Sequence, residues 1–243
     1  MRRGRRSVPG GRAAGKVVVV TGASSGLGRR LALDLAAAGS VVTAVARSDV
    51  SDTGAWTALL AEVAKTRGRV DILVNNAATD PGIRLAEMTM DDVRRTFEVN
   101  FFAAVAGTLA VLPGMIDRGA GIVVNVSSDG GRLPSPGPGI YPASKAALSA
   151  FTESVSFRVA RRGVRMHVVY PAWMPTAMGR DAIGRGLRAP PRLTRRTGEE
   201  VARLILARMG GRTVDISASR LIDAAAVFRV TLPRTYHFFR RTW

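Results

Sequence analysis

A run of four valines followed by a glycine-rich turn constrains the fold of this chain more than any other stretch. Residues 17–20 form a short β-branched run, typical of a strand that is buried on both faces of a parallel sheet. Residues 21–28, Thr-Gly-Ala-Ser-Ser-Gly-Leu-Gly, come next, and a helix-period segment then continues to Gly39. Glycines let a backbone approach phosphate groups closely, and a helix N-terminus favours negative charge. The stretch therefore predicts a cradle for the phosphates of a dinucleotide.

Strands and helices alternate along the rest of the chain. After the first strand we expect strands at residues 41–45, 71–74, 122–126, 164–169 and 213–216. We expect helices at residues 55–67, 89–112 and 141–163, and another that begins at Thr197. This alternation predicts an α/β fold, a single doubly wound parallel sheet with ligand sites at the carboxyl ends of its strands.

A tyrosine and a lysine, Tyr141 and Lys145, are four residues apart and would share one face of a helix. The ammonium group would then favour the phenolate and lower the phenol pKa from its usual value of about 10. Ser128 follows the strand at 122–126 and brings a hydroxyl to the same region, so the three groups suit proton transfer to or from an alcohol oxygen. Taken alone, Tyr-x-x-x-Lys is a weak signal, and an unrelated surface pair is the alternative.

The net charge of +18 could attract nucleic acid, anionic lipid or an anionic substrate. The arginines are scattered, without a basic stripe interleaved with aromatic residues, so we expect no binding to nucleic acid. The chain has no cysteine, which fits a reducing compartment. The basic N-terminus is not followed by an apolar signal-peptide core, and we find no run of about 18 apolar residues. We therefore expect a cytoplasmic protein.

In their order along the chain, these motifs resemble the short-chain dehydrogenase/reductase family over roughly residues 16–210. The matching residues are Thr21, Gly22, Gly26, Gly28, Asn75, Asn76, Ala77, Asn100, Ser128, Tyr141, Lys145, Pro171 and Thr176. Ser128 stands thirteen residues before Tyr141, which is the usual interval in the family. The resemblance implies a Rossmann-like oxidoreductase that interconverts a carbonyl and an alcohol with a nicotinamide cofactor.

The resemblance also implies roles for four catalytic residues, Asn100, Ser128, Tyr141 and Lys145. Tyr141 would protonate the carbonyl oxygen during reduction, and Lys145 would lower the pKa of the phenol and hold the nicotinamide ribose. Ser128 would bind the substrate oxygen, and Asn100 would position a water in a proton relay. The expected cofactor-binding residues are Thr21, Gly22, Ser24, Ser25, Gly26, Leu27, Gly28, Arg47, Asp49, Val50, Asn76, Ala77, Tyr141, Lys145, Pro171 and Thr176. No metal site is expected.

The end of the second strand bears on the choice of cofactor. NAD binding calls for an acidic residue there to hold the ribose 2′-hydroxyl, whereas NADP calls for a nearby arginine. By the family's spacing the acidic position falls on Ala46, and Arg47 follows it. The sequence therefore favours NADP(H), and Asp49 keeps NAD(H) as the alternative.

Three departures from the family pattern stand close to the expected cofactor site. Ala78 and Ala172 replace residues that are usually glycine. In addition, residues 47–52 join the second strand directly to the segment that normally follows the third, so one helix and one strand of the family are absent. We therefore predict six strands, with residues 41–45 as the new edge of the sheet. A cofactor-binding or regulatory protein with little turnover is the alternative function.

The chain divides into three parts. Residues 1–15 are predicted to be a basic disordered tail, residues 16–210 the dinucleotide-binding and catalytic domain, and residues 211–243 a C-terminal strand with a basic-aromatic extension. That extension could contact a membrane surface, which liposome flotation with and without residues 228–243 would test. It could equally pack on a second subunit, and we expect a homo-oligomer, either a dimer or a tetramer.

Three polar residues near the expected site have open or structural interpretations. Asp129 follows Ser128 directly, and either solvation of the loop or a contact with substrate would explain it. Ser127 is expected to pack at the end of the strand. His167 lies in an apolar strand and is expected to be a core residue with its hydrogen bonds satisfied.

Overall fold

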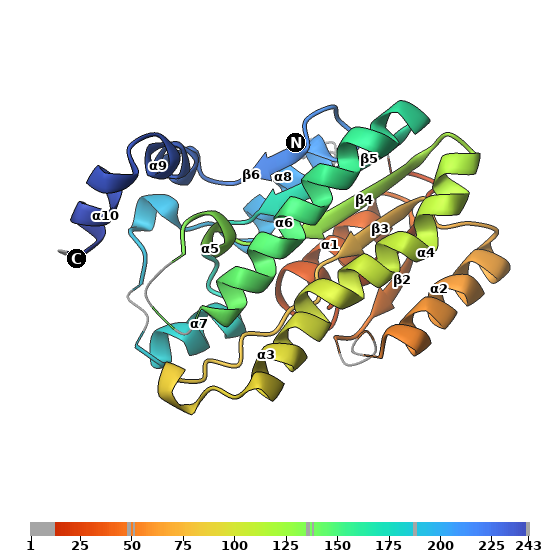
Figure 1. Cartoon of the computed structure of the whole chain (residues 1–243). Helices are drawn as coiled ribbons and strands as arrows, with labels where there is room; N and C mark the ends of the chain where they lie inside the picture. The colour runs from red at the N-terminus through yellow and green to blue at the C-terminus, as the bar shows by residue number, and fades with distance from the viewer. Residues whose placement is uncertain are drawn as a thin grey trace, which may run out of the picture.

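The computed structural model describes residues 13–47, 50, 52–134, 137, 139–186 and 189–241. Its strands are β1 (Val17–Thr21), β2 (Val41–Val45), β3 (Ile72–Asn75), β4 (Gly121–Val126), β5 (Val164–Tyr170) and β6 (Asp215–Ser217). Its α-helices are α1 (Gly26–Ala37), α2 (Thr53–Arg67), α3 (Met90–Phe97), α4 (Ala103–Asp117), α5 (Asp129–Arg132), α6 (Ile140–Val159), α7 (Ala177–Gly184), α8 (Gly198–Arg208), α9 (Arg220–Thr231) and α10 (Pro233–Arg241). The strands form one parallel sheet in the order β2-β1-β3-β4-β5-β6, with helices on both faces (Figure 1).

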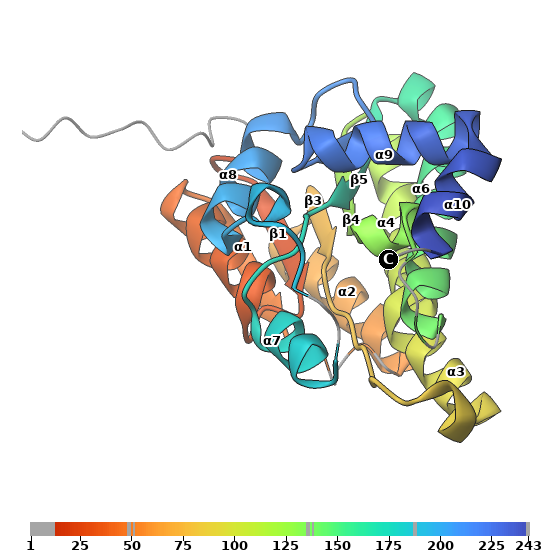
Figure 2. The ribbon, with the colours of Figure 1, turned by 90° about the vertical axis from the view of Figure 1, so that its left-hand side faces the viewer.

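The alternation of side chains along the valine run explains why the sheet has a core on each face. Val18 and Val20 pack with α1 and α8, and Val17 and Val19 pack with α2, α4 and α6 on the opposite face (Figure 2). All five residues of β1 are buried, because β1 lies inside the sheet, between β2 and β3. The doubly wound α/β fold expected from the sequence is confirmed.

The expected six strands are also confirmed, and β2 lies at an edge of the sheet. It pairs in parallel with β1, from Val17 beside Val41 to Thr21 beside Val45. The long helix α2 then leads from β2 to β3, on the other side of β1. The strand order therefore reverses at β1, and doubly wound folds bind their ligands at such a switch point.

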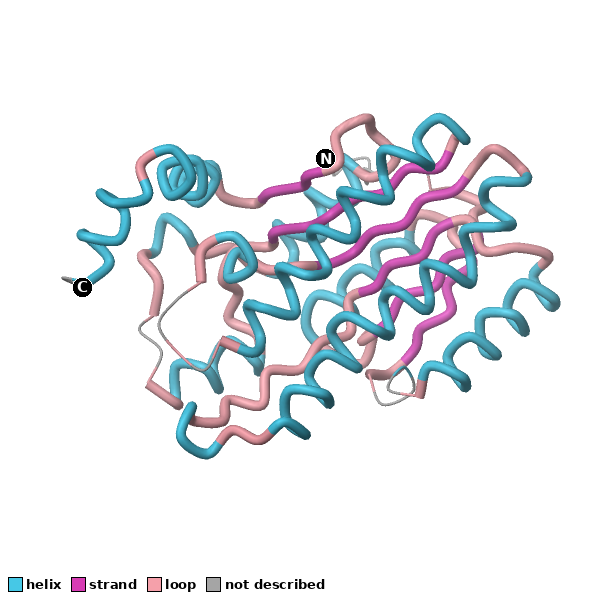
Figure 3. Tube along the Cα trace, viewed as in Figure 1, coloured by secondary structure: helices cyan, strands magenta, loops and turns pink. Residues whose placement is uncertain are grey.

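Loops and short helices gather at the carboxyl ends of the strands, while the longer helices run alongside the sheet (Figure 3). Thr89 and Thr197, where helices were expected to begin, both form capping boxes, with Asp92 and Glu200 as the reciprocal partners. Between α3 and α4 the helix widens into a π-helical turn, Glu98–Phe102, so the expected single helix has three parts.

Residues 13–15 were assigned to the disordered tail, and the structure corrects that boundary. They form a turn in which Ala13 is fully buried in the core, and Ser40 donates a 2.7 Å hydrogen bond from Oγ to the carbonyl of Ala13. Residues 1–12 lie outside the described residues, so the tail itself stays a prediction.

The helical stretch Met90–Asp117 is long and apolar enough to cross a membrane by length and composition, a test that the core helix of a soluble protein also passes. In this structure it packs against the body of the domain. The indole Nε1 of Trp56 donates a 3.0 Å hydrogen bond to the carbonyl of Ala103, and the same ring lies against Gly107. Side chains larger than hydrogen at position 107 would collide with the indole, which explains the glycine.

The C-terminal extension is helical, which the sequence analysis did not foresee. Ser219 caps α9 by accepting the amide of Ile222, and α10 follows after Leu232. Both helices lie beyond β6, near the carboxyl ends of the strands (Figure 1). Leu221, Val227 and Val230 are exposed on α9. Contact of this segment with a membrane stays a prediction.

Candidate active site

The glycine turn after β1 fits tightly against the end of β3. A Cβ atom on Gly28 would collide with the side-chain nitrogen of Asn76 and the carbonyl oxygen of Gly22. Gly22 has a φ of 65°, and a Cβ there would lie 2.9 Å from Asn76 Nδ2. Gly28 is therefore required because a side chain has no space there. Gly22 is required for the same reason and also because of its positive φ.

Thr21 and Asn76 hold this turn in place. Thr21 Oγ1 accepts hydrogen bonds from the amides of Asn76 and Ala77, at 2.9 Å and 3.0 Å. Asn76 Nδ2 donates in return to the carbonyl of Thr21 at 2.9 Å. The structure thus gives these predicted cofactor residues a framing role, in which side chains of β1 and β3 fix the shape of the backbone cradle.

The hydroxyl groups of Ser128 and Tyr141 meet at the carboxyl end of β4. Ser128 caps the short helix α5 and accepts a 3.1 Å hydrogen bond from the amide of Gly130. Tyr141, in the first turn of α6, is hydrogen-bonded to the hydroxyl of Ser128. The predicted pairing of the serine with the tyrosine is therefore present.

The predicted depression of the phenol pKa is wrong for this state of the protein. Burial raises the pKa of Tyr141 to about 12, and its hydrogen bond with Ser128 only partly opposes that rise. Burial also lowers the pKa of Lys145 to about 7. A lysine that is partly neutral near pH 7 supplies too little positive charge to pull the phenol pKa down.

Lys145 is nonetheless held next to the tyrosine. Its side chain is 1% exposed, Nζ donates a 2.8 Å hydrogen bond to the carbonyl of Val126, and Nζ lies 6.0 Å from the centroid of the Tyr141 ring. Because the hydrogen bond goes to the end of β4, the strand that leads into Ser128 also fixes the position of the ammonium group.

Asn100 lies in the π-helical turn and is buried. Its Oδ1 accepts the amide of Thr79 at 2.7 Å, while Nδ2 donates to the carbonyl of Thr79 at 2.9 Å and to Ser144 Oγ at 3.0 Å. One amide thus ties the loop after β3 to helix α6. Both polar atoms of the side chain are engaged with the protein, and the expected role in positioning a water stays a prediction.

A buried polar network supports these residues from below. Asn75 Nδ2 donates to Asn125 Oδ1 at 2.8 Å, and Asn125 Nδ2 donates to Thr152 Oγ1 at 2.9 Å. Ser127 Oγ donates to the carbonyl of Lys145 at 2.9 Å and lies 2.8 Å from Ser149 Oγ. The prediction that Ser127 has a structural role is confirmed, and Asn75 and Asn125 lock the ends of β3 and β4 together.

The residues expected to select the cofactor lie beside β2, at the end of the second strand. Arg47 extends toward the loop after β3, where Nη1 donates a 3.4 Å hydrogen bond to the carbonyl of Ala78. Val50 is 1% exposed and packs in the core with Trp56, so only its main chain could face a cofactor. Asp49 lies outside the described residues.

Thr176 lies across the glycine turn. A Cβ atom on Gly26 would sit 3.4 Å from its methyl group, and Thr176 caps α7 by accepting the amide of Gly179. The preceding Ala172 has a φ of 64°, a conformation that glycine adopts at lower cost, which explains the glycine usual in the family at this position. Thr176 therefore lies beside the glycine turn, and the cofactor-binding roles of Pro171 and Thr176 stay predictions.

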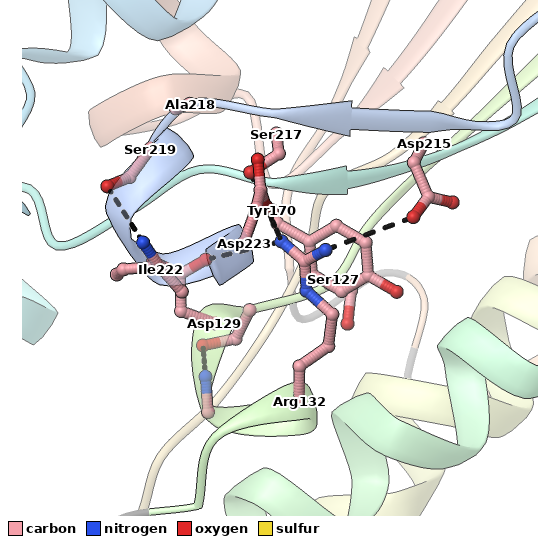
Figure 4. A network of polar contacts seen from close by, with 12 residues as sticks. Ser127, Asp129, Arg132, Tyr170, Asp215, Ser217, Ala218, Ser219, Ile222 and Asp223 are labelled. Carbon is pink, nitrogen blue, oxygen red and sulfur yellow. Dashed lines mark hydrogen bonds and ion pairs between the residues drawn. The ribbon is translucent and has the colours of Figure 1, made fainter. Parts of the chain in front are cut away.

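Two groups of residues were missed by the sequence analysis. Arg185, after α7, forms a 3.1 Å ion pair with Asp80, which ties the segment after α7 to the loop after β3. Arg132, at the end of α5, lies among three carboxylates beneath α9 (Figure 4). Apart from Asp129, which is three residues from Arg132, their partners are distant in sequence, so no local pattern pointed to these contacts.

His167 is a satisfied core residue, as expected. Its Nδ1 lies 2.9 Å from the carbonyl of Thr213, and Nε2 accepts the amide of Gly210 at 2.9 Å. Burial lowers its pKa, which keeps the imidazole neutral. The part of the chain that the structure describes also holds no group of His, Cys, Asp and Glu that could bind a metal ion.

The fold and the site geometry have counterparts among known proteins. The family model of the short chain dehydrogenases matches residues 43–184. Dehydrogenase/reductase SDR family member 7B of Xenopus laevis is 30% identical over 256 residues, covering 91% of this chain and 79% of that protein. The chain belongs to the short-chain dehydrogenase/reductase family of NAD(P)-binding oxidoreductases.

Solved structures agree with this assignment. A short-chain dehydrogenase from Streptomyces avermitilis is 28% identical, with a TM-score of 0.78 over 91% of this chain and 95% of the other. A short chain dehydrogenase from Burkholderia cenocepacia J2315, solved in complex with NADP, shares the fold with a TM-score of 0.79, 24% identity and coverage of 94% and 98%.

Proposed function

We propose that this protein is an NADP(H)-dependent reductase of a small carbonyl substrate, with Tyr141 as its proton donor. The observation that carries the proposal is the meeting of three groups: the phenol of Tyr141 hydrogen-bonded to Ser128, with the Lys145 nitrogen buried beside its ring. A phenol and a hydroxyl directed at one point can bind a carbonyl oxygen and protonate it.

The glycine turn and the start of α1 suit the phosphates of a dinucleotide. The glycine turn after β1 leaves no room for side chains, and the N-terminus of α1 follows directly, so backbone amides and the helix dipole favour a pyrophosphate. Arg47 is the residue that would hold a 2′-phosphate, and Thr176 would meet the nicotinamide half of the cofactor. When bound, the nicotinamide supplies the hydride. NADP in the related Burkholderia structure is consistent with this choice, and NAD(H) is the alternative.

The protonated phenol is the form of Tyr141 that carbonyl reduction requires. Because burial raises its pKa to about 12, the phenol keeps its proton throughout the neutral range. A protonated phenol is ready to give its proton to a carbonyl oxygen, whereas alcohol oxidation would need the phenolate. Lys145 would stabilise the phenolate that forms when the proton leaves, and Ser128 would hold the substrate oxygen during transfer.

Substitution of Tyr141 tests the proposal. The Tyr141→Phe change removes the proton donor and leaves the ring, so NADPH oxidation with a panel of ketones, aldehydes and acyl thioesters should fall about 100-fold or more. Binding of NADPH, followed by its fluorescence, should change little. Turnover close to that of the unmodified protein would contradict the mechanism. A wild-type protein that binds NADPH but reduces none of the panel would instead favour a binding or regulatory role.

We also propose that the protein is a homo-oligomer. Three large apolar side chains are exposed: Phe102 just before α4, Leu109 in α4 and Phe157 in α6. Exposed apolar residues of this kind fit a surface that a second copy covers. Light scattering should give a mass of at least two chains, and Phe157→Glu should reduce it. A monomeric wild-type protein would rule this out.

A further inference from the structure

Arg132 joins four segments that are far apart in sequence. It is the last residue of α5, and its side chain is only 19% exposed. Nη2 donates to Asp223 Oδ1 of α9 at 2.8 Å and to Ser217 Oγ of β6 at 3.1 Å. The guanidinium carbon lies 3.5 Å from the ring centroid of Tyr170, the last residue of β5 (Figure 4).

Arg132 supplies polar contacts between helix α9 and the body of the domain. None of the residues of α9 is fully buried, and its apolar side chains Ile222, Ala226 and Phe228 are only partly covered. Within the described part of the chain, two side chains of α9 make polar contacts with the body of the domain, and both go to Arg132. One is the contact from Asp223, and the other is a 2.8 Å hydrogen bond from Arg229 Nη1 to the carbonyl of Arg132.

The surroundings of the guanidinium are strongly acidic. The carboxylates of Asp129, Asp215 and Asp223 lie 4.0, 3.9 and 2.8 Å from its nitrogens. The carboxylate oxygens of Asp129 are buried and accept no hydrogen bond from the described residues, and burial raises the pKa of this group to about 6. The arginine therefore neutralises carboxylates that would otherwise repel one another, so its loss would separate α5 from α9.

A shift of α5 would be felt at Ser128. This serine is the cap of α5, and its carbonyl also accepts the amide of Gly131 at 3.0 Å. Helix α5 packs closely against α6, because a Cβ atom on Gly131 would lie 3.0 Å from the main-chain nitrogen of Ala146. The helix that carries Arg132 and the hydroxyl that binds Tyr141 therefore move together.

We propose that Arg132 is a positioning residue that couples helix α9 to Ser128, so that the C-terminal helix forms part of the frame of the active site. The proposal rests on the proposed function for its kinetic consequence, since Ser128 must take part in turnover for the rate to report its position.

The test uses the full-length protein with Asp223→Asn, a change on α9 outside the catalytic group, and with Arg132→Gln as the stronger variant. Both should lower kcat about tenfold or more, because small displacements of a catalytic group are costly, while the Kd for NADPH stays within about twofold. In a Ser128→Ala background, Asp223→Asn should lower kcat by less than about twofold, because residues that act through one another are not additive. Arg132→Lys should restore part of the activity.

Hydrogen exchange gives a readout that is independent of turnover. Amides 128–133 should exchange faster in Asp223→Asn than in the unmodified protein. The control is Glu199→Gln, which breaks a 3.0 Å ion pair with Arg203 on the surface of α8 and should alter neither exchange nor kcat. Unchanged exchange in Asp223→Asn, or an equal loss of kcat in the Ser128→Ala background, would overturn the proposal. A wild-type protein without turnover would count against the proposed function alone, because the exchange result would still decide the coupling.

Discussion

The two ends of the cofactor cleft are constructed in opposite ways. At the catalytic end, Asn100 and Lys145 are each 1% exposed, and the polar side-chain atoms of both residues are hydrogen-bonded to neighbouring segments of the fold. At the other end, β2 is the sheet edge, Val41 is 42% exposed, and Arg47 reaches across the cleft with a long 3.4 Å hydrogen bond. The proposed proton-transfer residues are therefore held within the core, whereas Arg47, which we propose selects the cofactor, lies at an exposed edge of the sheet.

We expect the largest effect from Lys145→Met, a substitution at the catalytic end. The change removes the cation that stabilises the phenolate, so kcat for carbonyl reduction should fall about 100-fold or more. In the unmodified protein the rate should decline as pH rises through about 7, since the ammonium of Lys145 is lost there. The pH–rate profile of the variant should be flat over the same range, and a profile with the same decline would assign that titration to another group.

A thermal-unfolding series shows whether Lys145→Met acts by damaging the fold. In the folded protein the pKa of Lys145 is about 7, below the ordinary value of 10.5, so the unfolded chain binds the proton more readily. The buried lysine therefore destabilises the folded protein increasingly as pH falls from about 10.5 to 7. The cost is about 1.4 kcal/mol for each unit of pKa difference, and it is full below pH 7. Relative to the unmodified protein, the Tm of the variant should thus improve steadily between pH 10 and pH 7. An offset that is independent of pH would mean that the lysine is not buried as described.

The smaller effect belongs to the exposed end. Arg47→Ala should weaken NADPH binding about tenfold, because an arginine–phosphate contact is a charge-assisted hydrogen bond, and should leave NADH binding nearly unchanged. Titration of both cofactors by fluorescence measures the ratio. Arg69→Ala is a suitable control, since Arg69 pairs with Asp71 before β3 and is not at the carboxyl ends of the strands. Equal losses for NADPH and NADH would remove Arg47 from cofactor selection.

The sequence predicted the fold because its signals are local. The valine run, the glycine turn and the capping boxes at Thr89 and Thr197 depend on neighbours within a few residues, and the shortened connection at 47–52 was enough to predict β2 as the edge. The catalytic group was predicted as a set of residues by resemblance, and the structure brings Ser128, Tyr141 and Lys145 together.

What the sequence could not supply depends on burial and on distant partners. The pKa of Tyr141 moves upward because of the packing around the ring, which a four-residue spacing does not reveal. The sequence does not distinguish Arg132 from the other arginines, because its partners Ser217 and Asp223 follow 85 and 91 residues later. Helix α9 was missed because its apolar residues form no stripe that faces a core.

The π-helical turn between α3 and α4 has a consequence for the tolerance of the chain to insertions and deletions. One residue corresponds to about 100° of rotation in an α-helix, so the widened turn sets the angular offset between the two helices that it joins. With the present offset, Asn100 faces Thr79 and Ser144 while Gly107 faces the indole of Trp56. Deletion of a single residue from this turn would convert it to a regular α-helix. Either Asn100 or Gly107 would then rotate away from its partners, even if the rest of the sequence stayed apolar. The length of this segment is therefore as strongly constrained as the identity of its residues.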